Sequence, residues 1–268
     1  MTTDTRASTG SPGSAPGGAQ AVSRALGLLH CFRDNAGELS ASDLARRTGL
    51  SVSTAHRLAR TLVAGHFLEQ DERTSRYRLG PSVAELGRLS LHQRGMHRAE
   101  PELAELARRT GATADLAIRS GPHAVILVGG SVDPEAGLGL RRPLHSTALG
   151  KVLLAWARPG EDDLDGLVLT AHTEHTITDP AALAAELALV RERGYALNEG
   201  ESAVGVRTLA VPVLNARGEA HSALALRSTP ELLDDAALPR QLARALACAN
   251  ALEILLLPPG ERRVRSGE

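Results

Sequence analysis

The spacing of apolar residues changes near residue 112. Before it, several stretches carry apolar residues three or four positions apart, the spacing of one buried face of an α-helix. After it, short β-prone runs bounded by turn residues alternate with further helical stretches. The pattern predicts an α-helical N-terminal part followed by a part that mixes strands and helices.

The helical spacing is clearest in residues 40–64. Ser40 and Asp43 are spaced as a capping box that opens a helix, and Gly49 stands where a glycine C-cap would end it. A second helix is expected to begin at Ser51. Its apolar residues share one face: Val52, Ala55, Leu58, Ala59, Leu62 and Val63. Two short helices joined by a glycine turn predict a helix-turn-helix.

The outward face of this second helix favours DNA binding. Hydroxyl groups near a helix start, followed by arginines, are side chains that reach base edges in a major groove. Residues 67–80 add two β-prone runs around a polar turn, which predicts a hairpin wing whose arginines neutralise phosphates. The alternative is that these polar residues only solvate the helix. The expected DNA-binding residues are Ser51, Ser53, Thr54, His56, Arg57, Arg60, Arg73, Arg76 and Arg78.

Positive charge is concentrated in the same region. The chain has 268 residues and a formal net charge of −1, an ordinary balance for a globular protein. Residues 46–78, however, contain seven arginines but only three acidic residues, Glu69, Asp71 and Glu72. A local basic patch on a nearly neutral chain indicates one docking face for nucleic acid.

Further helices and hairpins follow from the same patterns. Residues 81–96 predict a linker helix, and Pro101 is expected to start the next helix. Hairpins are expected at residues 112–131 and 208–228, and a glycine-rich loop at 133–143. The remaining helices are expected after Thr147, from Pro180 between caps Asp179 and Gly194, and over residues 231–257. The first helix should bury Val22, Ala25, Leu26, Leu29 and Phe32, and the last Leu242, Leu246, Ala249, Leu252 and Leu256.

The cysteines and the hydropathy bear on the compartment. Cys31 and Cys248 lie far apart in helical patterns, which favours buried thiols in a reducing cytoplasm. No apolar run is long enough to span a membrane, and the N-terminus has no signal-peptide pattern. We therefore expect a soluble, cytoplasmic protein without membrane contact.

Several of these stretches together resemble the IclR family of bacterial transcriptional regulators. The resemblance covers about residues 20–257 and is carried by LSASDLARRTGLSVSTAHRLARTLVAGHFLEQDERTSRYRLG, RRPLHSTALGKVLLAW and RERGYALNEGESAVGVRTLAVPV. It implies an α+β chain whose N-terminal winged helix-turn-helix is joined by a linker helix to a GAF-like α/β effector-binding domain. It also implies a homodimer or homotetramer on a pseudo-palindromic double-stranded DNA operator, controlled by a small-molecule effector. We expect a repressor.

Patterns and resemblance together divide the chain into five parts. We expect a disordered tail at 1–19, the winged helix-turn-helix domain at 20–80 and the linker helix at 81–96. The effector-binding domain follows at 97–258 and a frayed tail at 259–268. Effector binding would then change the relative placement of two winged domains through the linker helix.

The resemblance also implies where the effector binds. Carried over residue by residue, the site comprises His145, Ser146, Thr147, Ala148, Leu149, Gly150, Asn198, Thr208, Ala225 and Arg227. The chain departs from the family at four of these: Asn198 replaces an acid and Thr208 a cysteine, while Ala225 and Arg227 replace small polar residues. A guanidinium at position 227 favours a carboxylate effector. The alternative is a strand out of register, with Arg227 exposed to solvent.

Catalysis is the rival class of function. His172 and His175 flank Glu174, but threonine-rich surroundings without a third ligand favour a solvated loop over a metal pair. His145 beside Ser146 lacks a strand-elbow motif, and residues 137–140 lack the third glycine of a dinucleotide site. We expect no enzyme activity, cofactor or metal. A small-molecule-binding module without DNA regulation stays open; only the regulator predicts salt-dependent duplex binding.

Overall fold

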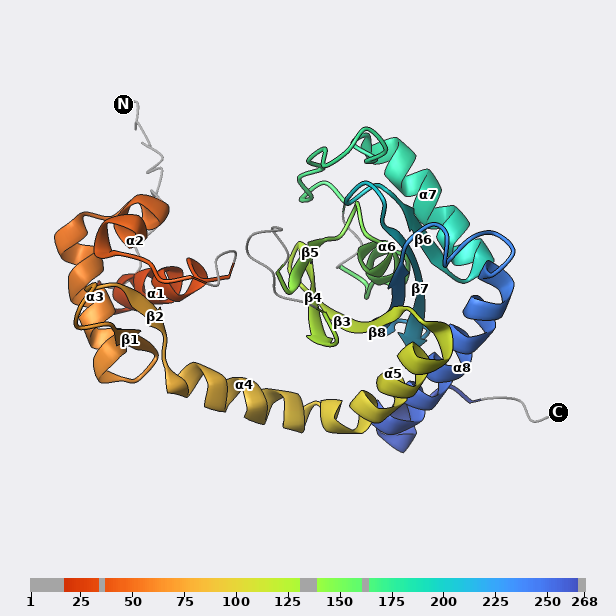
Figure 1. Cartoon of the computed structure of the whole chain (residues 1–268), viewed down its shortest axis with the longest axis horizontal. Helices are drawn as coiled ribbons and strands as arrows, with labels where there is room; N and C mark the ends of the chain where they lie inside the picture. Colours follow the sequence, from red (N-terminus) through yellow and green to blue (C-terminus); the bar gives the residue numbers. More distant parts are fainter. Residues whose placement is uncertain (1–16, 34–36, 131–138, 161–163, 265–268) are drawn as a thin grey trace, which may run out of the picture. The chain divides into compact units, whose positions relative to one another are not determined.

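The computed structural model describes residues 17–33, 37–130, 139–160 and 164–264. These form two compact units, Met1–Glu85 and Leu86–Glu268 (Figure 1). The first unit holds helices α1 (Gly17–His30), α2 (Ala41–Thr48) and α3 (Val52–Ala64) and strands β1 (Leu68–Gln70) and β2 (Tyr77–Leu79). Helix α4 (Pro81–Gln93) begins in the first unit and ends in the second. No helix of the described residues is long and apolar enough to cross a membrane.

The predicted helix-turn-helix is confirmed. At the start of α2, the Ser40 hydroxyl accepts the Asp43 amide at 3.1 Å, and the Asp43 carboxylate accepts the Ser40 amide at 3.1 Å. Gly49 ends the helix with φ of 68°, a conformation that glycine adopts without a Cβ penalty. Leu50 then packs partly buried against the core of the unit. Local caps therefore fix where this helix begins and ends.

The wing is confirmed as an antiparallel hairpin, in which Leu68, Glu69 and Gln70 pair with Leu79, Arg78 and Tyr77. An additional bridge between Leu39 and Tyr77 attaches the hairpin to the segment before α2. Tyr77 is fully buried among side chains of the three helices. The hairpin is therefore held by the same core that holds the helix-turn-helix.

Two predicted apolar faces differ from those observed. In α1, Val22 and Leu26 are 61% and 50% exposed and Leu28 is buried instead, whereas Phe32, just after the helix, is buried as predicted. Val52, at the first position of α3, is 51% exposed. The spacing of apolar residues is compatible with several buried faces on a short helix, and packing against α2 and α3 determines which face is buried. Helix α1 also starts at Gly17, earlier than predicted; residues 1–16 of the expected tail lie outside the described residues.

Helix α5 (Met96–Thr110) is continuous, so the predicted helix start at Pro101 is wrong. A proline inside a helix removes one amide donor and normally kinks or breaks it. Here Met96 and Ala99 before the proline and Leu103 after it are buried in one cluster. Burial of residues on both sides holds the first turn in line with the rest.

The second unit is built on a six-stranded sheet in the order β5-β4-β3-β8-β7-β6, with every neighbouring pair antiparallel. Both predicted hairpins, β3–β4 and β7–β8, are confirmed. Residues 131–138 of the expected glycine-rich loop lie outside the described residues. The strands are β3 (Thr113–Ser120), β4 (His123–Val128), β5 (Arg141–Pro143), β6 (Ala196–Glu199), β7 (Arg207–Leu214) and β8 (Ala220–Ser228).

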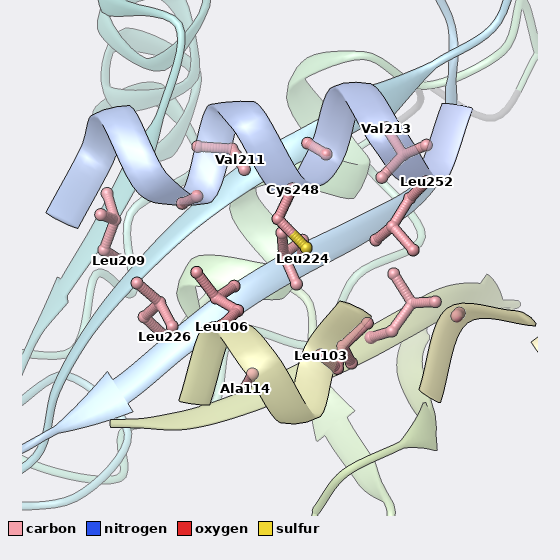
Figure 2. Packing of buried hydrophobic residues seen from close by; sticks show 14 of the residues in the cluster. Leu103, Leu106, Ala114, Leu209, Val211, Val213, Leu224, Leu226, Cys248 and Leu252 are labelled. Atoms are coloured by element: carbon pink, nitrogen blue, oxygen red, sulfur yellow. The ribbon is translucent and has the colours of Figure 1, made fainter. Parts of the chain in front are cut away.

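Helices cover both faces of this sheet. On one face, α5 and α8 (Leu238–Leu256) pack against the larger side chains of the strands, such as Leu224 and Leu226 (Figure 2). On the other face, α6 (Ala148–Ala155) and α7 (Pro180–Arg193) cover alanines such as Ala225. Side chains alternate between the faces of a strand, so leucine and alanine separate the two layers. The predicted fold class, a winged helix-turn-helix followed by an α/β domain, is confirmed.

The last two helices match their predicted bounds and buried faces to different extents. Helix α7 begins with the Asp179 carboxylate accepting the Ala182 amide at 2.7 Å and ends at Gly194, as predicted. Helix α8 begins at Leu238, later than predicted, and Leu246 is 40% exposed. Ala245 and Cys248 are buried instead, because the helix contacts both the sheet and α5.

The chain end is anchored as far as residue 264. A short 3₁₀ helix, η1 (Pro259–Glu261), follows α8, and Arg263 forms a 2.8 Å ion pair with buried Glu253. Fraying from residue 259 is therefore wrong for residues 259–264, and residues 265–268 lie outside the described part of the chain.

The two cysteines are free thiols in different surroundings. Cys248 is buried, as predicted, and burial raises its pKa to about 12, so the thiol stays protonated. Cys31 is only partly buried, contrary to the prediction, and its Sγ donates to the Gly27 carbonyl at 3.4 Å.

Candidate DNA-binding surface and effector site

The start of α3 presents an ordered group of hydroxyls. Ser51 is the N-cap, and its hydroxyl accepts the Thr54 amide at 3.3 Å. The same hydroxyl lies 2.8 Å from Thr54 Oγ1 and 3.1 Å from Ser53 Oγ. Ala55, Leu58 and Ala59 anchor the opposite side of the helix in the core. The helix N-terminus is therefore held rigidly with its hydroxyls near the surface.

Beyond these hydroxyls, three predicted DNA-binding side chains follow on the same helix. His56, Arg57 and Arg60 are all exposed. Among the residues that the structure describes, neither arginine has an ion-pair or side-chain hydrogen-bond partner. Unpaired, exposed guanidiniums are free to meet phosphate oxygens or guanine edges.

The three wing arginines are not equivalent, which the sequence did not indicate. The Arg73 side chain is exposed and has no ion-pair or hydrogen-bond partner within the described ranges. Arg76 donates to the Glu38 carbonyl at 3.1 Å, and Arg78 pairs with Glu69 at 2.7 Å across the hairpin. These partners arise from strand pairing and from the segment beside the wing. Arg73 is therefore the wing arginine whose side chain could contact a phosphate without first breaking an existing hydrogen bond or ion pair.

In the second unit, the structure brings three predicted effector residues side by side on the sheet face that α6 covers. Asn198 of β6 is paired with Thr208 of β7, and Thr208 is paired with Arg227 of β8. Residues directly opposite on antiparallel strands project from the same face. Ala225 lies two residues from Arg227 and therefore shares that face, in a buried cluster with Ala148 of α6.

Arg227 is partly exposed, and within the described residues only one nitrogen of its guanidinium has a partner. Its side chain is 31% exposed, and its Nε lies 3.3 Å from Oδ2 of buried Asp115 on β3. The other Asp115 oxygen accepts the Gly130 amide at 2.6 Å. The sequence did not single out Asp115, because its contact with Arg227 depends on the pairing of β3 with β8.

Asn198 has a local role. Its Oδ1 accepts the Glu201 amide at 2.8 Å, and its Nδ2 donates to Ser202 Oγ at 2.6 Å. The side-chain amide therefore organises the turn after β6. Thr208 is buried beside it, with 7% of its surface exposed.

The loop and helix start at residues 145–150 are buried. Thr147 is the N-cap of α6, as predicted: its hydroxyl accepts the Gly150 amide at 3.1 Å and donates to the Pro143 carbonyl at 2.7 Å. The Gly150 amide is thus already engaged by the Thr147 hydroxyl. The Ser146 hydroxyl is buried and has no partner among the described residues.

His145 turns toward another loop. Its Nε2 lies 3.0 Å from the Thr170 carbonyl, and its ring stacks on His172 at 5.8 Å between centroids. Burial lowers the pKa of His145, so the ring is neutral at physiological pH. His172 therefore packs against the loop before α6, while His175 remains largely exposed.

Family models match both units of the chain. The IclR helix-turn-helix domain matches residues 21–72, and the bacterial transcriptional regulator IclR C-terminal domain matches residues 90–254. The chain belongs to the IclR family. It is a transcriptional regulator with an N-terminal DNA-binding helix-turn-helix and a C-terminal effector domain.

Individual relatives agree with this assignment. The chain is 38% identical over 244 residues to the HTH-type transcriptional regulator XynR of Escherichia coli K12, covering 87% of this chain and 97% of XynR. It is 31% identical to the HTH-type transcriptional repressor AllR of Salmonella paratyphi A, covering 78% and 79% of the two chains. An IclR homolog from Microbacterium hydrocarbonoxydans, crystallised with 4-hydroxybenzoate, superposes with a TM-score of 0.74 at 27% identity, covering 88% of this chain and 98% of that one.

A buried ion network adjoins the IclR-family effector region. Lys151 of α6, the only lysine of the chain, lies 3.0 Å from Glu186 of α7 and 2.7 Å from Glu201. Glu186 also pairs with Arg193 at 2.9 Å. Burial raises the pKa of Glu201, while Lys151 opposes that shift. Sequence spacing could not reveal this network, because its members come from three separated elements.

Proposed function

We propose that this IclR-family chain represses transcription by binding a pseudo-palindromic operator as a homodimer or homotetramer. A small carboxylate held in the C-terminal domain modulates that binding. The protein acts in the cytoplasm, where the DNA is, by binding and not by catalysis. The observation that carries the proposal is the set of unpaired, exposed arginines on α3 and the wing, Arg57, Arg60 and Arg73.

Base contacts are assigned to the start of α3 and phosphate contacts to the wing. Ser51, Ser53 and Thr54 stand at the helix start, where a recognition helix reaches base edges. Arg57 and Arg60 follow one and two turns later. Arg73, supported by Arg76 and Arg78, would position the domain on the phosphate backbone without reading sequence.

Helix α4 supports assembly into a dimer. None of its described residues is buried, and Leu86 and Leu89 are 52% and 50% exposed on one stripe with Val83. An apolar stripe at helical spacing that stays in water is unfavourable unless a partner covers it. A second copy of α4 offers the same stripe, which a two-fold interface requires.

The effector assignment rests on Arg227 and on the Ser146 hydroxyl in the loop before α6, which has no partner among the described residues. A guanidinium binds a carboxylate through two parallel hydrogen bonds. The relative crystallised with 4-hydroxybenzoate supports a carboxylate in this domain. Coupling to DNA requires only that the ligand prefer one spacing of the two DNA-binding units over another.

An electrophoretic mobility shift on the DNA upstream of the gene tests the proposal. We expect a shift that resists non-specific competitor and weakens with salt. Arg73→Ala should reduce the magnitude of the slope of log K against log salt by about 0.9, the value for one phosphate contact, and Arg57→Ala and Arg60→Ala should each weaken the competitor-resistant shift. Arg217→Ala, which removes an exposed arginine from the β7–β8 turn, is the matched control and should leave binding unchanged. A folded protein that gives no competitor-resistant shift would favour the ligand-binding module without DNA regulation.

A further inference from the structure

A surface groove of about 410 Å³ runs between α5 and α8, which lie side by side in the second unit (Figure 1). The two helices are antiparallel. Gln241, near the start of α8, donates to the carbonyl of Thr110 at the end of α5, at 3.3 Å. Cys248, two turns further along α8, donates to the carbonyl of Glu102 at 3.9 Å. This register determines which side chains share each end of the groove.

The charged residues of the groove are separated by sign. Glu102 and Glu105 lie on the N-terminal side of α5. Arg109 lies at its C-terminal side, where the Arg244 guanidinium donates to the Arg109 carbonyl at 2.8 Å, and Arg240 lies one turn earlier on α8. Seven residues of helix separate the outer acid from the arginine of α5, or about 10 Å. The groove therefore has an acidic end and a basic end.

An apolar stripe of α8 borders the groove and faces solvent. Leu246 and Ile254 are 40% and 54% exposed, and Ala243 and Ala247 are exposed as well. At 3.6 residues per turn these four positions fall within about 100° of the helix circumference. A continuous apolar stripe in water is unfavourable unless a partner covers it.

The charge pattern favours a second copy of this chain as that partner. A two-fold axis through the middle of the groove turns the acidic end of one copy over the basic end of the other. Both ends are then matched at once, and the apolar stripes meet between them. A different protein would need the opposite charges at the same spacing, whereas a second copy carries them by symmetry.

We propose that the α5–α8 groove joins two copies of this chain through a two-fold interface in which Glu102 meets Arg240 of the partner subunit. Among the described residues, neither of these side chains forms an ion pair or a hydrogen bond. Glu105, by contrast, already pairs with Arg108 at 2.7 Å. Glu102 and Arg240 are therefore the charges of the groove that a partner can neutralise without breaking an existing contact.

The inference deepens the assembly part of the proposed function and rests on it. Helix α4 supplies one self-complementary surface. A second such surface on the same chain gives a homotetramer with two kinds of two-fold axis in place of a homodimer. The α5–α8 groove is the contact that joins one α4-linked dimer to another.

Light scattering coupled to size-exclusion chromatography tests the interface on the full chain without DNA. We expect the wild type at the mass of four chains. Arg240→Glu and Glu102→Arg each place like charges opposite one another, so each variant should run at half that mass. Arg217→Glu reverses an exposed charge in the β7–β8 turn and is the matched control, which should keep the wild-type mass.

Mixing the two variants provides the decisive step. When Arg240→Glu meets Glu102→Arg, each contact across the axis again joins an acid to an arginine. The equimolar mixture should therefore recover the mass of four chains, which no change within one subunit can explain. Arg240 is the third residue of α8, where a glutamate interacts favourably with the helix dipole, so that variant should fold. If Glu102→Arg does not fold, Leu246→Glu places a charge on the exposed stripe and should also halve the mass.

Three results would overturn the interface: a wild-type mass of one or two chains, Arg240→Glu at the wild-type mass, or a mixture that stays at half mass. A groove that serves another protein or a small ligand would give the second of these. Operator binding is measured on the same samples, and every variant should retain a competitor-resistant shift. A wild type that forms tetramers without binding the operator would contradict the proposed function and not the interface.

Discussion

Lys151 is the residue whose removal should most affect the effector domain. Its side chain is 2% exposed and lies 3.0 Å from Glu186 and 2.7 Å from Glu201. Lys151→Met keeps the aliphatic stem and removes the charge. Glu186 would still have Arg193, whereas Glu201 would lose the cation that contacts its carboxylate and would remain buried. Removing one partner of a buried pair costs roughly 3–5 kcal/mol.

This loss should be measurable as a fall in Tm. For a unit of this size 1 kcal/mol corresponds to roughly 2–4 °C, so we expect the transition to fall by roughly 6–20 °C. The single tryptophan, Trp156, ends α6 and reports on this unit by its fluorescence. The winged helix-turn-helix contains no tryptophan and does not contribute to the signal.

The loss of stability caused by Lys151→Met should also depend on pH. Burial raises the pKa of Glu201, so the folded chain binds a proton on this carboxyl more readily than the unfolded chain does. Stability from such a group is lost as pH rises through its folded-state pKa. Lys151→Met removes the charge that opposes the shift, so the variant should lose less stability at pH 5 than at pH 8.

A second variant separates charge from packing. In Lys151→Met/Glu201→Gln neither buried charge remains, and most of the lost stability should return. The reasoning is wrong if the single variant melts within about 2 °C of the wild type, a shift that corresponds to at most 1 kcal/mol. A double variant that is no more stable than the single one would contradict it as well.

Two further predictions concern the loop before α6. Gly150→Ala places a Cβ 2.2 Å from the Leu144 carbonyl oxygen and should destabilise the unit by about 2–3 kcal/mol. Gly87→Ala, whose Cβ would have no atom within 4 Å, is the control and should be neutral or stabilising. Equal melting temperatures for the two variants would contradict the packing argument. Burial lowers the pKa of His145, so the unfolded chain binds a proton there more readily and stability should fall as pH drops below about 6.5. His145→Gln should make Trp156-monitored melts less sensitive to pH between 7.5 and 5, and an unchanged sensitivity would exclude this cause.

Local signals in the sequence determined much of the fold. The capping box at Ser40 and Asp43, the cap at Asp179 and the glycines 49 and 194 predicted helix ends correctly, because such signals act within one turn of the helix. Alternating apolar runs likewise predicted the hairpins. The helix-turn-helix and its outward arginines follow from the same short-range rules.

Which face of a helix is buried was decided by tertiary structure. Val22 and Leu26 fit an apolar stripe but are exposed, and Pro101 lies inside a helix that packing keeps continuous. Short helices offer several stripes of similar quality, so the neighbours that pack against them make the choice. Helix propensity is a weak preference that such contacts override.

The composition of the candidate site was also decided by tertiary structure. Arg227 could be named from its position, but its contact with Asp115 and the Lys151–Glu201 pair form only because distant strands and helices meet in the folded domain. The partners of Arg76 and Arg78 likewise depend on strand pairing. The sequence determines which charges the chain carries and where its elements begin and end. Only the folded sheet determines which charges meet, because electrostatic interactions depend on distance in space and not along the chain.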